Sequence, residues 1–307
     1  MEKAMGRVGT TGGLVVAALL GVLADGAGSA VAAESPRFPR EPLDIRFPVN
    51  PVRPDDVAVI IGNADYRTLG RDIPDVIPAH ADAESFFRYA VATLGVRERN
   101  VIDLRDATGT ELVRVFGTAA DPRGQLSDWV KPGTDVTVYY SGHGAPGPDG
   151  GTYLVPVDAE AARVHLGGYP LATLFANLDK LPARRVTLIL EACFSGQAQG
   201  GTLVPGASGI AVTPRTPAPL AKVTVISAGA ADQIASWDES RRSGLFTKHY
   251  LTGMAGGADR RPHGDGDGRV SPDEIKAYLD ATLTYEARRF WGRTQIAEIR
   301  AAGREAR

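Results

Sequence analysis

The stretch VTVYYSGHG, residues 136–144, combines a run of apolar and β-branched residues with a polar end in which glycines flank a histidine. Its first five residues are typical of a strand that is buried on both faces of a sheet. Runs of similar character cover residues 57–61, 100–104, 186–190 and 223–227. Helical patterns separate these runs. Strands that alternate with helices predict an α/β fold with a mostly parallel central sheet flanked by helices on both faces.

The helices are expected from their own signals. One helix is predicted from Asp82, and Thr108-Gly-Thr-Glu111 is a capping box that opens another. Further helices are predicted over residues 171–178, 244–254 and 272–290. The helix predicted from Asp82 has an apolar inner face that comprises Phe86, Phe87, Ala90 and Leu94.

The N-terminus has the pattern of a targeting segment. Lys3 and Arg7 precede an apolar stretch, residues 14–23, which is too short to span a bilayer comfortably. Ala30-Val-Ala32 fits an A-x-A cleavage site. We therefore expect residues 1–32 to be a signal peptide and the protein to be secreted or periplasmic, without stable membrane association after signal removal. An uncleaved N-terminal anchor is the alternative.

The rest of the chain is expected to form one domain over residues 57–307, preceded by a proline-rich arm over residues 33–56. The net charge of −2 gives no strong field of one sign, so we expect no nucleic-acid partner. The chain has one cysteine. In an oxidising compartment Cys193 is therefore either a free thiol or one half of an intermolecular bridge.

Two predicted strands end in candidate catalytic groups. The third ends in YYSGHG, with His143, and the fourth in LEACFSG, with Cys193. Strands that follow each other in sequence are often neighbours, and parallel sheets bind ligands at the carboxyl ends of their strands. A thiolate is a nucleophile, and a neighbouring imidazole can accept its proton and then donate to the leaving amine. The N–H groups of Gly144 and Cys193 are candidates for an oxyanion hole.

YYSGHG and LEACFSG resemble the two catalytic motifs of the caspase-like superfamily, which includes metacaspases, paracaspases and bacterial caspase-domain proteins. VIIGNADY, residues 59–66, resembles the opening strand and turn of the family, and Gly244-Leu-Phe-Thr247 resembles a late motif. The resemblance implies a caspase-hemoglobinase-like three-layer sandwich. It also implies a cysteine endopeptidase that cleaves proteins or peptides through a thioester acyl-enzyme and requires no cofactor for its chemistry.

The resemblance also bears on specificity. Animal caspases typically carry Gln two residues before the nucleophile, whereas metacaspases and paracaspases carry Asp there and cleave after Arg or Lys. This chain has Glu191 at that position, and Asp82 matches a second acidic residue of the same pocket. Two substrate-binding carboxylates would attract Arg or Lys, although Glu is one methylene longer than Asp. A structural role of Asp82 as a helix N-cap is the alternative.

Residues 196–221 are rich in glycine and proline and predict an exposed loop. This loop matches the connection between large and small segments that some caspase-like enzymes cleave. With an acidic pocket, Arg215 is the candidate self-cleavage site. An uncut surface loop is the alternative.

Residues 263–274 resemble an EF-hand loop. The candidate calcium ligands are Asp265, Asp267, Arg269, Ser271 and Glu274. Position 1 holds His263, where a hard cation prefers oxygen. The alternative is a plain helix start, with Ser271 and Glu274 as a capping box.

Other functions are less consistent with the sequence. A catalytically silent caspase-like domain that binds proteins or peptides is the main alternative. A serine hydrolase is disfavoured because no G-x-S-x-G motif is present. A zinc hydrolase is disfavoured because the histidines are scattered without ligand spacing.

Overall fold

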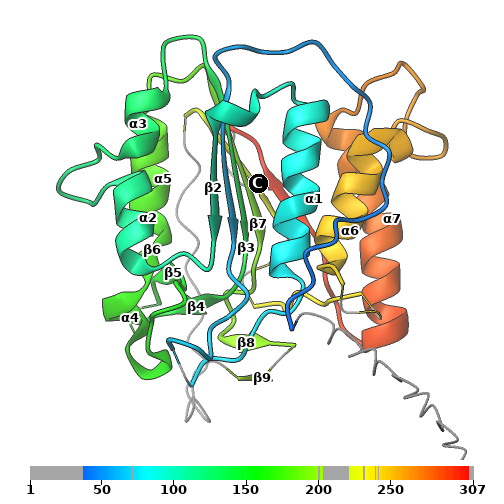
Figure 1. Ribbon diagram of the computed structural model, residues 1–307. Coiled ribbons are helices and arrows are strands. Elements are labelled where there is room, and N and C mark those ends of the chain that lie inside the picture. The colour runs from blue at the N-terminus through cyan, green and yellow to red at the C-terminus, as the bar shows by residue number, and fades with distance from the viewer. Residues whose placement is uncertain are drawn as a thin grey trace, which may run out of the picture. The chain divides into compact units, whose positions relative to one another are not determined.

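A six-stranded sheet in the order β11-β10-β7-β3-β1-β2 lies at the centre of the described part of the chain (Figure 1). This computed structural model describes residues 37–303, apart from 71, 149, 200, 203–220, 231, 239 and 241. The parallel strands are β1 (Val57–Gly62), β2 (Val101–Arg105), β3 (Asp135–Ser141), β7 (Arg185–Glu191) and β10 (Val223–Ser227). Strand β11 (Glu298–Arg300) pairs antiparallel with β10. The five predicted strands and the α/β fold class are confirmed.

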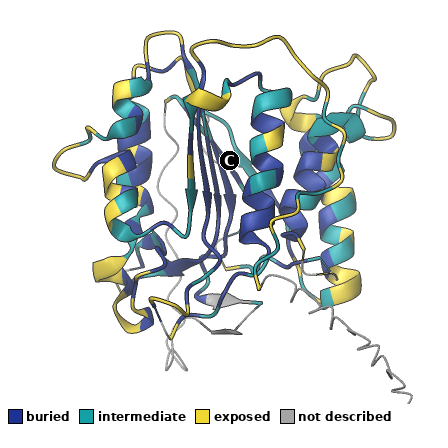
Figure 2. Ribbon diagram, viewed as in Figure 1, coloured by how far each residue is buried: buried dark blue, intermediate teal, exposed yellow. Residues whose placement is uncertain are grey.

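Helices cover both faces of the sheet (Figure 1). One layer contains α1 (Ala79–Ala92), α6 (Leu245–Thr252) and α7 (Pro272–Trp291). The other contains α2 (Gly109–Phe116), α3 (Gln125–Trp129) and α5 (Leu171–Lys180). Alternate residues of β1 point into the two layers: Val59 and Ile61 pack in one core, Ala58 and Ile60 in the other. Burial on both faces explains the continuous apolar run of β1, which is buried throughout (Figure 2).

Both predicted capping boxes are present: Thr108 caps α2 through Glu111, and Ser271 caps α7 through Glu274. The alternative role of Asp82 as an N-cap is wrong. Helix α1 begins at Ala79, with Pro78 at its N-cap, so Asp82 lies inside the first turn. Its carboxylate turns inward instead, towards the end of the sheet.

Several short elements were not predicted. Strands β4 (Gly144–Pro146), β5 (Thr152–Leu154) and β6 (Tyr169–Pro170) form a small antiparallel sheet. A hairpin of β8 (Gln197–Ala198) and β9 (Gly201–Thr202) follows β7. The remaining helical turns are η1 (Glu98–Asn100), η2 (Ala161–Arg163), α4 (Val164–Gly167) and the π-turn η3 (Gly253–Gly257).

The described part of the proline-rich arm, residues 37–56, runs in an extended conformation along the domain. Leu43, Ile45 and Phe47 pack against the core that contains α1, and the backbone N–H of Leu43 donates to Ser85 Oγ at 2.9 Å. The expected signal peptide and Arg215 lie outside the described residues. None of the described helices is long and apolar enough to cross a membrane.

Candidate active site

The register of the sheet brings His143 and Cys193 together. Strands β3 and β7 are adjacent and parallel, and their last registered pair is Ser141 and Glu191. His143 and Cys193 each follow two residues after that pair. The Gly142 N–H donates to the Glu191 carbonyl at 3.2 Å. The two candidate catalytic residues line one cavity together with residues that include Asp82, Glu191, Gln199, Ala235, Trp237 and Gly244.

The His143 imidazole is held on several sides. Its Nε2 lies 2.6 Å from the Pro74 carbonyl oxygen. A carbonyl can only accept, so Nε2 carries the proton and Nδ1 is the basic nitrogen. The His143 backbone N–H donates to the Tyr66 hydroxyl at 2.9 Å, and the Tyr66 ring lies 4.7 Å from the imidazole between centroids. The Tyr140 hydroxyl donates to the His143 carbonyl at 2.7 Å.

Burial keeps both candidate catalytic groups neutral in this cavity. Burial lowers the pKa of His143 to about 4. The hydrogen bond to the Pro74 carbonyl and the charge of Asp75 raise this pKa, but by less than burial lowers it. Burial raises the pKa of the Cys193 thiol to about 12. The Ala235 N–H, which donates to Sγ at 2.6 Å, and the charge of Arg293 both lower this pKa, but by less than burial raises it. At neutral pH the cavity therefore holds a thiol and a neutral imidazole, so an attack by this sulfur would require its proton to move at the same time.

Asp82 and Glu191 both line this cavity, and each has its own hydrogen-bond donors. Asp82 accepts from the Gly244 N–H at 2.9 Å and from Ser141 Oγ at 3.1 Å. Glu191 Oε2 accepts from the Thr247 N–H at 2.7 Å and from Thr247 Oγ1 at 2.9 Å. The late motif Gly244–Thr247 thus supplies donors to both carboxylates. A Cβ at residue 244 would overlap the Glu191 carboxylate, so only glycine fits there.

The two carboxylates do not both ionise freely. Burial raises the pKa of Asp82 well above its usual range, and the charge of Glu191 adds to that rise. Burial raises the pKa of Glu191 to about 7, although the Thr247 hydrogen bonds lower it. The Oε1 atom of Glu191 is buried and has no hydrogen-bond partner among the described residues. Near neutral pH the pair therefore retains protons that an incoming cation could replace.

The backbone at Gly144 runs against the segment that carries Cys193. A Cβ on Gly144 would lie 2.7 Å from the Cys193 carbonyl oxygen and would overlap the Phe194 ring. The requirement for glycine here is therefore one of space. The N–H groups of Gly144 and Cys193, proposed for the oxyanion hole, belong to these two neighbouring segments, and their role stays a prediction.

The cavity is small in this structure. Its volume is about 20 Å³, which is about the room that one water molecule needs. Gln199, in the β8–β9 hairpin, accepts from the Trp237 N–H at 2.6 Å, and both residues line the cavity. A side chain as long as arginine is larger than this volume, so residues that line the cavity would have to move to admit one.

Several residues of the site were missed by the sequence analysis. The Pro74 carbonyl holds His143, but a backbone carbonyl has no sequence signal. Tyr66 lies in the quoted stretch of residues 59–66, yet nothing there marked its hydroxyl as a support for the histidine. Gln199 and Arg293 come from segments of no recognisable pattern.

The acidic loop near the C-terminus has a different membership from the one predicted. Carboxylate oxygens of Asp259, Asp265 and Glu274 lie within 4.8 Å of one another. Asp259 accepts from the Gly266 N–H at 3.0 Å and the Gly268 N–H at 3.1 Å. The chain thus wraps around Asp259. His263 lies outside the cluster.

The other predicted ligands have roles within the loop itself. The His263 ring packs edge-on against Tyr278, at 5.4 Å between centroids. Asp267 Oδ1 accepts from the Arg269 N–H at 2.8 Å, and Ser271 caps α7. Calcium binding by Asp265, Asp267, Arg269, Ser271 and Glu274 stays a prediction.

A mostly parallel sheet covered on both faces, with a polar pocket at the carboxyl ends of β3 and β7, places the protein in the α/β class. The family model for the caspase domain matches residues 55–265, and the chain belongs to that family. The resemblance drawn from the two motifs is confirmed.

Two solved structures are similar to this chain, and the first of them shares its fold. Protein GSU0716 from Geobacter sulfurreducens is 19% identical, with a TM-score of 0.53, over 82% of this chain and 95% of that one. Caspase-1 from Spodoptera frugiperda is 14% identical, with a TM-score of 0.48, over 84% of this chain and 94% of that one. No curated protein matches the sequence significantly.

Proposed function

We propose that this protein is a cysteine endopeptidase in which Cys193 is the nucleophile and His143 is first a general base and then a general acid. The observation that carries the proposal is the shared cavity, in which the only cysteine of the chain lies with a histidine of fixed tautomer. Membership of the caspase-domain family supports the same chemistry.

The reaction follows from the proton positions. Nδ1 of His143 accepts the thiol proton while Sγ of Cys193 attacks the scissile carbonyl carbon. The N–H groups of Gly144 and Cys193 stabilise the resulting oxyanion, and loss of one such donor typically costs about 3–4 kcal/mol. The C–N bond then breaks, and the departing amine takes the proton from His143. A water molecule, deprotonated by His143, hydrolyses the thioester, releases the acid and restores the thiol.

Cleavage after Arg or Lys is the specificity that the pocket supports. A guanidinium or ammonium group would replace the protons held by Asp82 and Glu191 and would pair with the unsatisfied Oε1 of Glu191. At an effective dielectric constant of about 20, each pair of unit charges at about 4 Å contributes roughly 4 kcal/mol before desolvation. An aspartate side chain would meet like charge.

We further propose that the enzyme is exported and acts on proteins or peptides outside the cytoplasm. The support is the N-terminal pattern of residues 1–32, with its apolar stretch and A-x-A site. N-terminal sequencing of the protein from the culture medium or periplasm checks this, and a start at residue 33 is expected.

Covalent labelling tests the chemistry itself. An arginyl peptide chloromethyl ketone should alkylate Cys193, as located by mass spectrometry, and His143→Ala should slow labelling at least a hundredfold. A Cys193→Ala protein is the unlabelled control. Wild-type protein that binds the peptide reversibly but stays unlabelled would instead identify a silent binding domain.

A further inference from the structure

The supports of His143 converge on a second carboxylate, Asp75. Asp75 directly follows Pro74, whose carbonyl holds the imidazole. The Asp75 carboxylate also accepts from the backbone N–H groups of Tyr66, at 3.1 Å, and Arg67, at 3.0 Å. Tyr66 in turn packs on the imidazole and binds the His143 N–H. One buried side chain therefore fixes the backbone of both residues that hold the histidine.

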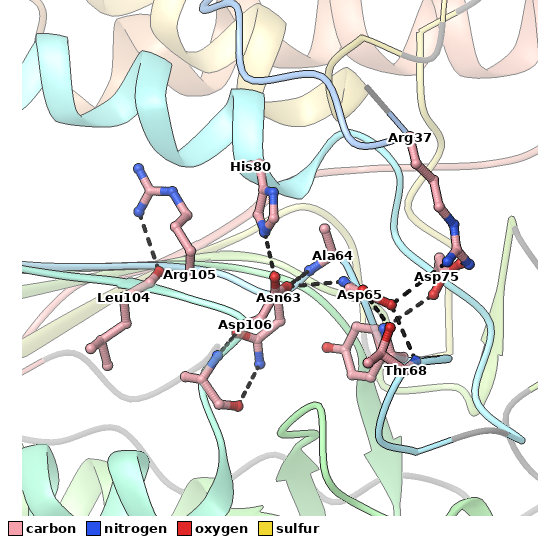
Figure 3. Close-up of polar contacts among 12 residues, drawn as sticks. Arg37, Asn63, Ala64, Asp65, Thr68, Asp75, His80, Leu104, Arg105 and Asp106 are labelled. Atoms are coloured by element: carbon pink, nitrogen blue, oxygen red, sulfur yellow. Dashed lines mark hydrogen bonds and ion pairs between the residues drawn. The ribbon is translucent and has the colours of Figure 1, made fainter. Parts of the chain in front are cut away.

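The N-terminal arm reaches this carboxylate through Arg37. The guanidinium of Arg37 donates to Asp75 Oδ2 and lies 3.9 Å from Asp65 (Figure 3). Asp75 is 7% exposed, whereas half of the Arg37 side chain is exposed. Arg37 also lies over the Phe38 ring, at 5.0 Å, and that ring packs edge-on against His80. The arm is thus anchored directly beside the support of His143.

Charged groups of both signs surround Asp75 and His143. The groups that face Asp75 or His143 are Arg37, Asp65, Tyr66, Arg67, Tyr140, Asp82, Glu191 and Cys193. The charge of Asp75 favours the protonated imidazole of His143. Arg37 pairs with Asp75 directly, and Arg67 lies 3.7 Å from it, so both offset that charge. The exposed Arg37 is therefore the partner through which the arm can alter the field at the histidine.

We propose that Arg37 and Asp75 form a positioning pair through which the N-terminal arm sets the orientation and the electrostatic surroundings of His143. The inference rests on the proposed function, in which His143 is the general base. Neither residue is a catalytic residue, because neither lines the cavity that holds Cys193. They act through Pro74 and Tyr66 and through their own charges.

The direct test is an NMR titration of the His143 imidazole, assigned with a His143→Gln variant. Arg37→Gln leaves the Asp75 charge less offset, so the His143 pKa should rise by about half a unit, a roughly threefold gain in proton affinity. Asp75→Asn removes the negative charge, so the pKa should fall. The double variant should lie closer to Asp75→Asn than to Arg37→Gln, because Arg37 loses the carboxylate that holds it beside Pro74 and Tyr66 when Asp75 is replaced. Arg40→Gln, on the same exposed arm, is the matched control and should change nothing.

Kinetics give the second measurement. The acid limb of kcat/KM for an arginyl peptide should move to higher pH in Arg37→Gln and to lower pH in Asp75→Asn. Both variants should lower kcat more than they raise KM, because the base is displaced while the pocket is intact.

Opposite shifts are the signature of the pair, since a loss of stability alone would move both variants in the same direction. Unmoved or parallel His143 titrations in folded variants would overturn the proposal. If Asp75→Asn fails to fold, an unchanged titration in Arg37→Gln, whose side chain is half exposed, is enough to overturn it. Opposite NMR shifts in a protein that cleaves no peptide would leave the pair standing and refute the proposed function instead.

Discussion

At the scale of single residues, burial dominates the chemistry of the site. The same burial that raises the pKa of Cys193 lowers the pKa of His143, so a charged thiolate–imidazolium pair is disfavoured at rest. Sγ lies against the Ala235 N–H, which already provides one donor for a developing thiolate. The thiol of the resting protein should therefore react slowly with small thiol reagents.

Thiol reactivity should follow from this neutral state. Iodoacetamide should modify Cys193 slowly at neutral pH, with a rate that still increases above pH 9, because the pKa of the thiol is raised to about 12. Alkylation rates from pH 6 to 10, with free cysteine as the reference, give the measurement. A plateau near neutral pH would reveal a preformed thiolate and contradict the account.

Glu191 should lower the stability of the folded protein above neutral pH while it favours the binding of basic side chains. Its pKa is raised from 4.5 to about 7 on folding, so between these values the folded protein binds more protons, and stability falls as the pH rises. That shift corresponds to a loss of the order of 3 kcal/mol above pH 7. Glu191→Gln should therefore be more stable than wild type at pH 8 and similar at pH 4.5, while KM for arginyl peptides should rise.

Urea unfolding at the two pH values gives the measurement, with the exposed Glu98→Gln as the control. A Glu191→Gln protein that is less stable than wild type at pH 8 would show that the carboxylate stabilises the fold, against the prediction.

At the scale of elements, the strands and helix starts that have a clear pattern in the sequence were predicted correctly. The parallel strands were identified because burial on both faces makes them continuously apolar, and the two capping boxes because they are local. The adjacency of β3 and β7 followed from their order in the chain.

Features without a local pattern could not be predicted. Strand β11 has only three residues, all half-buried, and pairs with a strand far away in sequence. The start of α1 was placed too late because Asp82 resembled a cap, whereas its carboxylate serves a tertiary contact with Gly244. Asp259 was missed as a member of the acidic loop because Arg260–His263 separate it from the standard EF-hand spacing.

Calcium binding is the prediction that belongs to this loop. Titration calorimetry with calcium should show binding that Asp259→Asn weakens at least tenfold, because a carboxylate oxygen of Asp259 lies within 4.8 Å of those of Asp265 and Glu274. His263→Ala should bind like wild type, since His263 packs on Tyr278. No heat of binding at millimolar calcium would contradict calcium binding and would show that the loop serves only as the start of α7.

At the scale of the whole molecule, two segments far apart in sequence meet the site. The N-terminal arm anchors the support of His143 through Arg37, and the hairpin after β7 covers the cavity through Gln199. Residues 203–220 continue from that hairpin towards β10 and include Arg215, outside the described residues.

Self-processing is testable at this scale. Cleavage after Arg215 should give wild-type protein two fragments by mass spectrometry, whereas Cys193→Ala should stay intact because it lacks the nucleophile. Arg215→Gln should also stay intact while it retains activity on peptides. Identical intact masses for wild type and Cys193→Ala would rule self-cleavage out.

We propose that Cys193 and His143 hydrolyse peptide bonds after a basic residue selected by Asp82 and Glu191. A panel of fluorogenic peptides that differ only in Arg, Lys or Asp before the scissile bond tests this directly. Wild type should cleave the Arg and Lys peptides at least a hundredfold better than the Asp peptide, and Cys193→Ala should cleave none. Preference for the Asp peptide, or equal turnover by Cys193→Ala, would contradict the proposal.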